Sequence, residues 1–304
     1  MNRRKFIRST SQAGAFLPFL GLDNDWFHES HIEHLVILHT NDVHSRIDPF
    51  PMDGGRNEGR GGAARRAAIV KKVRKEFDNV LLFDSGDIFQ GTPYFNMFKG
   101  ELEIKLMSKI GYDAGTIGNH DFDAGIDGFH RQLKHANFPF VISNYEMSDT
   151  VMNGNYKAYH TFQKGDIKVG IYGLGIELEG LVPKTLYKNT QYQDPIGAAQ
   201  KYENILRSDM NCDLVICLSH LGFKYRDGKV SDVTLAQNTS ETDIILGGHT
   251  HTFLREPVKE RNLIGNEVII NQVGFGGILL GRLDVYFNKK KKKNIKHKNN
   301  IVVH

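Results

Sequence analysis

Apolar and polar positions alternate in blocks along the chain, and each block has the length of a strand or a helix. Short apolar runs predict strands at 34–40, 80–85, 114–117, 140–143, 167–173, 214–219, 244–246, 268–273 and 278–287. Apolar residues at helical spacing predict helices at 61–77, 96–110, 126–136 and 196–210. Strands that alternate with helices are typical of β-α-β units, in which helices cover the faces of sheets. No internal repeat and no linker rich in Pro, Gly or Ser interrupts 30–288, so we predict a single α/β domain there.

The composition is that of a globular protein large enough to form its own core. The chain has 304 residues, of which 40% are hydrophobic, and a chain of this size can fold without disulfide cross-links. Cys212 and Cys217 lie in one apolar run, where alternation places them on opposite faces of a strand, which excludes a disulfide framework. Beyond the first 22 residues no apolar stretch approaches the roughly 20 residues that span a bilayer, which excludes a polytopic membrane protein.

The net charge of +4 is concentrated at the two ends of the chain. Residues 289–304 carry seven Lys and no acidic residue. Residues 26–288 carry 28 Lys and Arg against 33 Asp and Glu, a net charge of −5. This mildly acidic body has no basic stripe for a phosphate backbone, so nucleic-acid polymers are not expected partners and a nuclease is the least favoured class.

Each end of the chain has a distinct pattern. Residues 1–29 contain adjacent Arg3 and Arg4 ahead of an apolar stretch at 13–22, which resembles a twin-arginine export signal and its linker. We therefore expect an exported or periplasmic protein, tethered to the membrane if the signal is retained; a basic N-terminus with no targeting role is the alternative. The Lys-rich tail at 289–304 is predicted to be solvated, although docking on anionic lipid or an acidic partner would also suit its charge.

Side chains that bind metals gather at the ends of five predicted strands. These motifs are Asp42-Val43-His44, Asp84-Ser85-Gly86-Asp87, Gly118-Asn119-His120-Asp121, Ser219-His220 and Gly247-Gly248-His249-Thr250-His251. Any one of them is more often an ordinary turn or strand end, but five in one chain make chance a poor explanation. Because ligands bind at the carboxyl ends of strands in open α/β sheets, we expect the five motifs to converge on one site.

The spacing and chemistry of these residues favour a metal centre. Asp42 and His44 are two positions apart, as are His249 and His251. On extended backbone the two side chains of each pair would point to the same side and could bind one ion. Mixed imidazole and carboxylate ligands suit zinc, manganese, iron or cobalt, whereas an all-oxygen set suits magnesium or calcium. The adjoining glycines are predicted to form tight turns with positive φ that bring the backbone close to an ion or phosphate; they are Gly86, Gly118, Gly247 and Gly248.

The order of the five motifs resembles that of the calcineurin-like metallophosphoesterases. More narrowly, segments 39–44, 85–91, 118–123 and 218–222 resemble the catalytic domain of bacterial 5′-nucleotidases and UDP-sugar hydrolases, and Gly61-Gly62-Ala63-Ala64 resembles the start of that subfamily's first helix. The resemblance covers about residues 34–285. It implies a four-layer α/β/β/α sandwich that holds two divalent metal ions.

Carried over motif by motif, the resemblance also implies a role for each residue. One metal would be held by Asp42, His44 and His251, the other by Asn119, His220 and His249, with Asp87 between them. The two oxygens of a carboxylate can serve two cations at the roughly 3.5 to 4 Å separation of two-metal sites. His120 and Asp123 would form a catalytic pair, with Asn119 and His120 steadying the transition state; Asp123 could equally cap the helix that follows it.

These assignments lead to a hypothesis about function. We expect hydrolysis of a phosphate monoester, with a nucleotide as the substrate, by in-line attack of a metal-bridging hydroxide. Full-length relatives carry a second, C-terminal domain that binds the nucleobase, and we expect a separate polypeptide to supply it here, unless the substrate needs no base platform. Cyclic-nucleotide or other phosphodiesterase activity, a thiosulfohydrolase-like reaction and an exported metal-binding scaffold remain alternatives, although every ligand position is filled, which argues against a scaffold.

Overall fold

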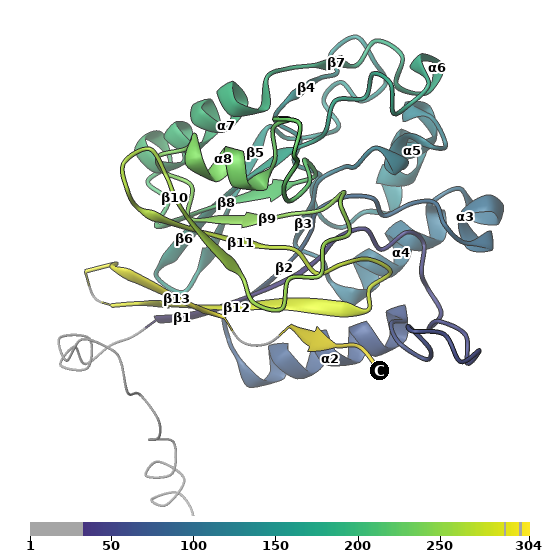
Figure 1. Cartoon of the computed structure of the whole chain (residues 1–304), viewed down its shortest axis with the longest axis horizontal. Coiled ribbons are helices and arrows are strands. Elements are labelled where there is room, and N and C mark those ends of the chain that lie inside the picture. The colour runs from purple at the N-terminus through teal and green to yellow at the C-terminus, as the bar shows by residue number, and fades with distance from the viewer. Residues whose placement is uncertain (1–32, 289, 298–299) are drawn as a thin grey trace, which may run out of the picture.

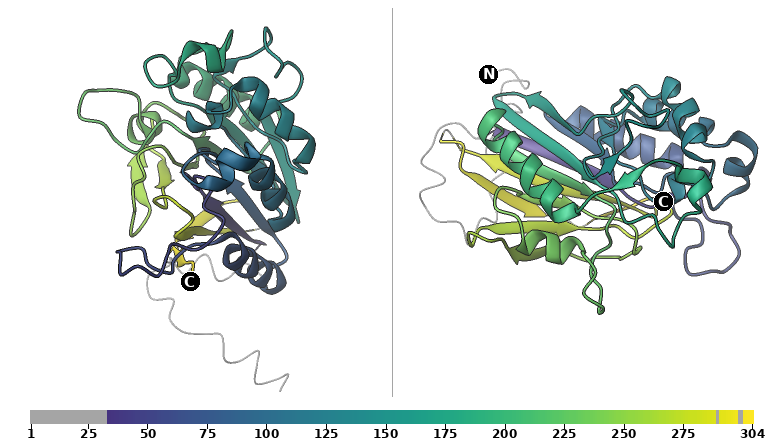
Figure 2. Two further views of the ribbon diagram at one scale, coloured as in Figure 1. Left: turned by 90° about the vertical axis from the view of Figure 1, so that its right-hand side faces the viewer. Right: turned by 90° about the horizontal axis from the view of Figure 1, so that it is seen from above.

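The computed structural model describes residues 33–304, apart from 289, 298 and 299. The predicted export signal at 1–29 therefore lies outside the described residues. Within the described ranges, every helix is too short or too polar to cross a bilayer. Two six-stranded sheets pack face to face, and helices cover both outer faces (Figures 1 and 2), which confirms the predicted α/β/β/α sandwich.

The first sheet has the strand order β13-β12-β1-β2-β3, with β14 also pairing with β12. Its strands are β1 (Glu33–Thr40), β2 (Val80–Asp84), β3 (Ala114–Gly115), β12 (Leu279–Phe287), β13 (Lys293–His297) and β14 (Ile301–Val302). Strands β1, β2 and β3 are parallel, so their carboxyl ends share one edge. Strand β12 runs antiparallel to β1 and lies between β1 and the edge strand β13.

The second sheet has the order β10-β11-β9-β8-β6-β5. Its strands are β5 (Tyr159–Lys164), β6 (Ile167–Leu174), β8 (Leu214–Ser219), β9 (Ile244–Leu246), β10 (Val258–Arg261) and β11 (Glu267–Asn271). The four central strands are parallel, and the two edge strands are antiparallel to their neighbours. A small separate pair joins β4 (Tyr145–Glu146) to β7 (Gln191–Tyr192).

Helices connect the strands and cover the sheets. The α-helices are α2 (Ala63–Glu76), α3 (Pro93–Phe98), α4 (Glu101–Ile110), α5 (Ile126–Gln132), α6 (Lys184–Tyr187), α7 (Pro195–Asn204) and α8 (Asp232–Gln237). Shorter turns are η2 (His120–Phe122), η3 (Leu133–His135) and the π-helical η4 (Ile205–Asp209). Figure 1 shows α2 below the first sheet and α7 and α8 above the second.

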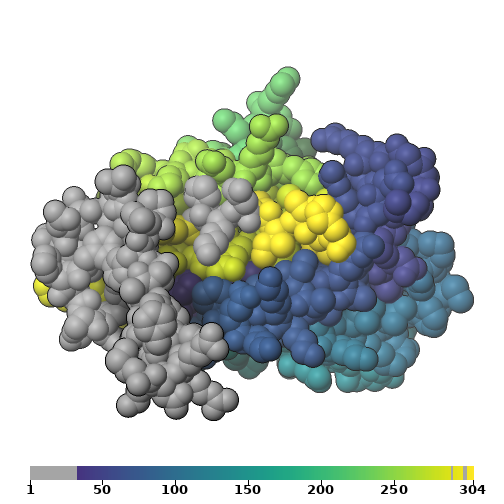
Figure 3. All heavy atoms as spheres, turned by 90° about the horizontal axis from the view of Figure 1, so that it is seen from below, coloured from purple at the N-terminus to yellow at the C-terminus, as the bar shows by residue number. Residues whose placement is uncertain are grey.

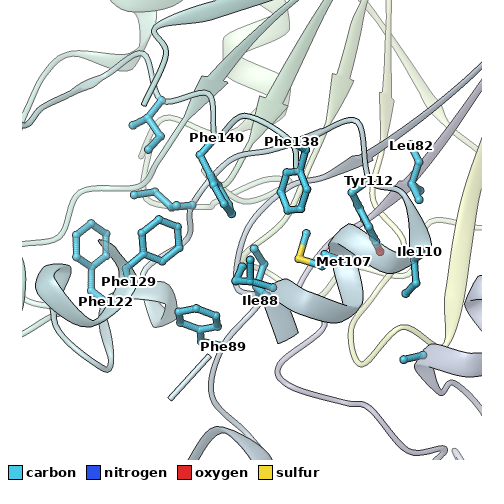
Figure 4. Packing of buried hydrophobic residues seen from close by; sticks show 14 of the residues in the cluster. Leu82, Ile88, Phe89, Met107, Ile110, Tyr112, Phe122, Phe129, Phe138 and Phe140 are labelled. Atoms are coloured by element: carbon cyan, nitrogen blue, oxygen red, sulfur yellow. The ribbon is translucent and has the colours of Figure 1, made fainter. Parts of the chain in front are cut away.

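Alternation along the strands builds three hydrophobic layers. In β1, Leu35 and Ile37 face the second sheet, while Val36 and Leu38 face the helices of the first. The same alternation in β8 places Val215 and Cys217 under α7 and α8. The two cysteines are both buried and free. In the outer layer beside α4, aromatic rings pack against one another, as Figure 4 shows for Phe129, Phe138 and Phe140.

Three predicted helices and one predicted strand are interrupted. The helix expected at 126–136 is α5 followed by the 3-10 turn η3. The helix expected at 96–110 is two helices, because Lys99 and Gly100 adopt left-handed conformations between them. A Cβ on Gly100 would lie 2.2 Å from the Phe89 ring, so this bend lets the ring pack there. The helix expected at 196–210 is α7 followed by the π-helical turn. The segment 140–143 forms only isolated bridges, to Gly115 and Lys157.

The prediction of a solvated tail at 289–304 was wrong for the described part of that segment. Strand β13 pairs with β12 over five residues, and Val303 is fully buried. Ile295 packs on the core between the sheets, and the Gly61 amide donates to the Val303 carbonyl. Figure 3 shows the C-terminal residues, in yellow, beside the blue residues of the α2 region. The apolar residues scattered among the lysines thus extend the first sheet.

Candidate metal centre

The five predicted motifs meet at one end of the two sheets. They follow the parallel strands β1, β2, β3, β8 and β9, whose carboxyl ends lie together. The side chains form two groups, and within each group the donor atoms lie within 4.8 Å of one another. We call Asp42, His44 and His251 the open cluster, and Asp87, His220 and His249 the buried cluster. The sequence prediction of convergence is thereby confirmed.

In the open cluster three donor atoms point at a common position. The His44 and His251 Nε2 atoms are 2.9 Å apart. The Asp42 Oδ1 atom lies 3.3 Å from His251 Nε2 and 3.9 Å from His44 Nε2. The Phe89 carbonyl lies 3.2 Å from Nδ1 of His44 and orients that ring, so that Nε2 is the nitrogen available to an ion.

The buried cluster adjoins the open one and brings in Asn119. Asp87 Oδ2 is 3.1 Å from His220 Nε2 and 3.9 Å from His44 Nε2, so this carboxylate lies between the two clusters. The Asn119 Oδ1 atom is 2.8 Å from His249 Nδ1. The Ser85 carbonyl holds Nδ1 of His220 at 2.6 Å. These positions suit the arrangement that the resemblance implies, with Asp87 able to reach an ion on either side.

The backbone at these residues differs from the extended form expected from the spacing. Five of the predicted metal-binding residues have positive φ values of 49° to 71°: Asp42, His44, Asp87, His249 and His251. The side chains therefore converge because the loops turn sharply after each strand, not because alternation aims them. A left-handed conformation at a residue other than glycine costs on the order of 1 kcal/mol and is common at functional sites.

The glycines near the clusters serve chiefly for close approach. Only Gly86 has the expected positive φ, at 88°, among the four predicted positions. At Gly118 a Cβ would lie 2.2 Å from Asp87 Oδ1 and 2.5 Å from His220 Nε2. At Gly248 it would lie 2.8 Å from His220 Nδ1. Any side chain at these positions would therefore displace the donors.

Burial and neighbouring charges set the protonation of the histidines. Burial lowers the pKa of His249 to about 4 and also lowers the pKa of His44. At His220 burial acts in the same direction, but the carboxylates of Asp87 and Asp42 outweigh it and raise the pKa to about 10. A positive charge is thus favourable beside Asp87, where the carboxylates gather.

The donor set fits two divalent cations. Nε2 of His220 is fully buried and makes no well-aligned hydrogen bond, although Asp87 Oδ2 lies 3.1 Å away. A buried nitrogen without a partner lowers the stability of the fold, unless it shares a proton with a neighbouring group or binds a cation. Imidazole, carboxylate and amide donors together suit zinc, manganese, iron or cobalt.

Beside the clusters lies the predicted His120 and Asp123 pair. Nδ1 of His120 is 3.0 Å from Asp123 Oδ2, and this hydrogen bond raises the pKa of His120. The backbone N–H of His120 donates to Asp87 Oδ1 at 2.8 Å, and the His120 ring packs edge-on against His44 at 5.3 Å. The pair is therefore held against both clusters. The side chain of Asp123 makes no cap bond to the helix that follows, α5, whose N-cap is Gly125.

One residue of the motifs has a role that sequence reasoning missed. The buried Asp121 carboxylate accepts hydrogen bonds from the backbone N–H groups of Asp87, Ile88, Phe89 and Gly118. It thereby ties the loop after β2 to the loop after β3. The sequence showed only that Asp121 lies next to His120, because its partners are backbone groups without a residue signature.

The chain belongs to the calcineurin-like phosphoesterase family, whose profile matches residues 35–253. It is 34% identical over 276 residues to a snake venom 5′-nucleotidase of Gloydius brevicauda, covering 84% of this chain and 46% of that protein. It is also 34% identical over 292 residues to the 5′-nucleotidase of Bos taurus, covering 88% and 49%. The chain thus spans about half the length of these curated relatives.

Solved structures show the same fold. The 5′-nucleotidase precursor from Thermus thermophilus superposes with a TM-score of 0.79 and 30% identity, covering 89% of this chain and 55% of that one. The NAD nucleotidase of Haemophilus influenzae superposes with a TM-score of 0.76 and 26% identity, covering 90% and 50%. The family expected from the motifs is thereby confirmed.

Proposed function

We propose that this protein is a metal-dependent phosphoester hydrolase that releases phosphate from nucleoside monophosphates. The observation that carries the proposal is the geometry of the site: two clusters of mixed donors share a boundary at Asp87, with the His120 and Asp123 pair beside them. The names of its relatives, 5′-nucleotidase and NAD nucleotidase, support a nucleotide as the substrate.

Each residue then has a proposed role. Asp42, His44 and His251 would hold one cation and Asn119, His220 and His249 the other, with Asp87 within reach of both. When bound, the cations supply Lewis acidity at the phosphoryl oxygens and a nucleophilic water at neutral pH. Hydrolysis joins the water oxygen to phosphorus and breaks the ester P–O bond, so the leaving oxygen needs a proton. His120 can give that proton from Nε2, because Asp123 holds its Nδ1.

The proposal is tested by phosphate release from AMP with protein loaded with manganese or zinc. We expect release that a chelator abolishes. We expect His120→Asn to retain its metal content and to lose about 100-fold or more in turnover, since positioned proton transfer contributes about that much. Unchanged turnover would remove His120 from the mechanism, and hydrolysis of a phosphodiester but not of AMP would replace the monoesterase proposal with a diesterase.

We also propose that a second polypeptide completes nucleotide binding. The curated relatives are about twice as long as the matched region, which supports a further unit beside this one. Apolar side chains are exposed on α3, which follows the Asp87 loop, at Met97 (72%) and Phe98 (44%). Co-purification of a nucleotide-binding subunit that lowers KM for AMP would support this, and failure of any such subunit to associate would count against it.

We further propose export by the twin-arginine route, on the strength of Arg3 and Arg4 ahead of the apolar stretch. Fractionation of cells that express the full chain tests this. The unchanged chain should leave the cytoplasm, and replacement of both arginines by lysine should retain it there. Equal distribution of the two forms would contradict the proposal.

A further inference from the structure

A cavity beside the metal centre suggests what the site accepts as a leaving group. It has a volume of about 720 Å³, within the range of small-molecule sites, and the metal-binding residue His249 forms part of its wall. The cavity runs from His249 between the loop after β6, the start of α7 and the loop after β8. A phosphoryl group held at the clusters would therefore lie next to this cavity, which is open to its ester substituent.

The lining combines aromatic rings with acidic groups. Tyr192 and Tyr225 contribute rings, and the hydroxyl of Tyr225 is engaged with the Leu221 carbonyl at 2.7 Å. Three carboxylates line the same space, from Glu177, Glu179 and Asp194. Burial raises the pKa of Tyr192 to about 12, and the nearby charges of Glu177 and Asp194 act in the same direction.

Away from the metal centre, little positive charge offsets these carboxylates. Lys229 is the basic residue that lines the cavity, and its ammonium pairs with Asp227 at 3.5 Å. The Asp194 carboxylate accepts hydrogen bonds from the backbone N–H groups of Ile196 and Gly197 at the start of α7. Glu177 and Glu179 are exposed on the rim, where an incoming group would meet their charge.

We propose that this cavity is the leaving-group subsite and that Glu177 and Glu179 are specificity-determining residues, which exclude leaving groups with negative charge. The inference rests on the proposed function and narrows its substrate class. Carboxylates accept hydrogen bonds from hydroxyl groups and repel phosphate, while the tyrosine rings pack on flat or apolar groups. The site thus takes monoesters of neutral, hydroxyl-bearing compounds such as nucleosides in preference to nucleoside diphosphates.

The test compares matched substrates on metal-loaded full-length protein. AMP and ADP differ in whether the leaving group is neutral adenosine or anionic AMP, and phenyl phosphate and 4-carboxyphenyl phosphate make the same comparison without a nucleotide. For each pair the ratio of kcat/KM, anionic over neutral, is measured. In Glu177→Gln/Glu179→Gln we expect both ratios to rise about fivefold, since two like charges near the leaving group are removed.

The control is Asp78→Asn/Asp166→Asn, which makes the same change in net charge at the amino ends of β2 and β6, away from the site. We expect its ratios to match those of the unchanged protein. Raising the salt from about 0.05 M to about 0.5 M should raise the ratios in the unchanged protein and have little effect in the Glu177/Glu179 variant.

Ratios that stay constant in the Glu177/Glu179 variant, or rise equally in the control, would overturn the inference. Failure of the proposed function looks different. If phenyl phosphate is hydrolysed and AMP is not, the proposal of a nucleotide substrate fails. The comparison of phenyl phosphate with 4-carboxyphenyl phosphate still tests the role of Glu177 and Glu179. Hydrolysis of neither monoester would overturn both.

Discussion

The two clusters of the metal centre carry similar donors but differ in depth. In the buried cluster the side chains of His220 and Asp87 are 0% and 2% exposed. In the open cluster His251 is 41% exposed and His44 is 12% exposed, while Asp42 is fully buried. Donors fixed in a dry, packed wall cannot move to compensate for a lost neighbour, whereas water can replace a donor at an exposed position. The buried cluster should therefore tolerate change less well than the open one.

Removal of one histidine from each cluster tests this difference in tolerance. We expect His220→Ala to lower turnover on AMP about 1,000-fold and to lose bound metal, because cation stabilisation of the transition state is worth several kcal/mol. His251→Ala should lose about tenfold, since water can take its place. Metal content per chain and turnover are the readouts, with His130→Ala on α5 as a control. Equal losses in the two variants would contradict the assigned difference.

Adding a methyl group between the donors should have the next largest effect. Gly118→Ala places a Cβ 2.2 Å from Asp87 Oδ1, whereas at Gly115 in β3 the nearest atom is 3.4 Å away. Neither glycine has a positive φ, so the pair separates crowding from backbone strain. We expect Gly118→Ala to lose about 100-fold in activity, as for other misplaced catalytic groups. Similar activity in the two variants would show that the loop shifts to admit the methyl.

Loss of the loop tether should mainly affect stability. Asp121→Asn keeps one carbonyl oxygen but presents an NH₂ group to backbone N–H donors that the carboxylate now satisfies. Leaving buried donors unpaired costs about 1 to 3 kcal/mol each, so we expect a loss of about 2 kcal/mol, measured by denaturant unfolding. Asp166→Asn, in the exposed turn between β5 and β6, is the control. A stability equal to that of the control would mean that the tether is dispensable.

The smallest predicted effect concerns the pH profile. The hydrogen bond from Asp123 raises the pKa of His120, so the protonated form that can donate to the leaving group persists to higher pH and is lost as pH rises through that pKa. Asp123→Asn should lower this pKa, so activity should begin to fall at a lower pH, with a loss of about tenfold at neutral pH. A basic limb that does not move would remove Asp123 from this role.

Whether an element could be predicted from the sequence depends on how its residues are buried in the fold. Strands β8 and β9 were predicted at their observed bounds, because they are apolar on both faces and lie inside a sheet. Edge strands β5 and β10 were missed, since YHTFQK and VKER are half exposed and lack a clear apolar run. The break at Gly100 depends on the Phe89 ring, a contact that helical spacing cannot reveal.

The candidate site shows the same division. The donors were found because Asp, Asn and His stood beside glycines at strand ends, and the structure brings them all together. The tether at Asp121 acts through backbone groups, and the cavity rim at Glu177 and Glu179 combines with residues from separate loops. Neither has a local motif, so only the folded chain shows them.

We propose that two cations act together at the boundary formed by Asp87. A titration of chelator-treated protein with manganese tests this, with bound metal per chain and phosphate release from AMP followed together. Activity should stay near zero through the first equivalent and rise with the second. Full activity with one ion per chain, or none with two ions bound, would contradict the claim.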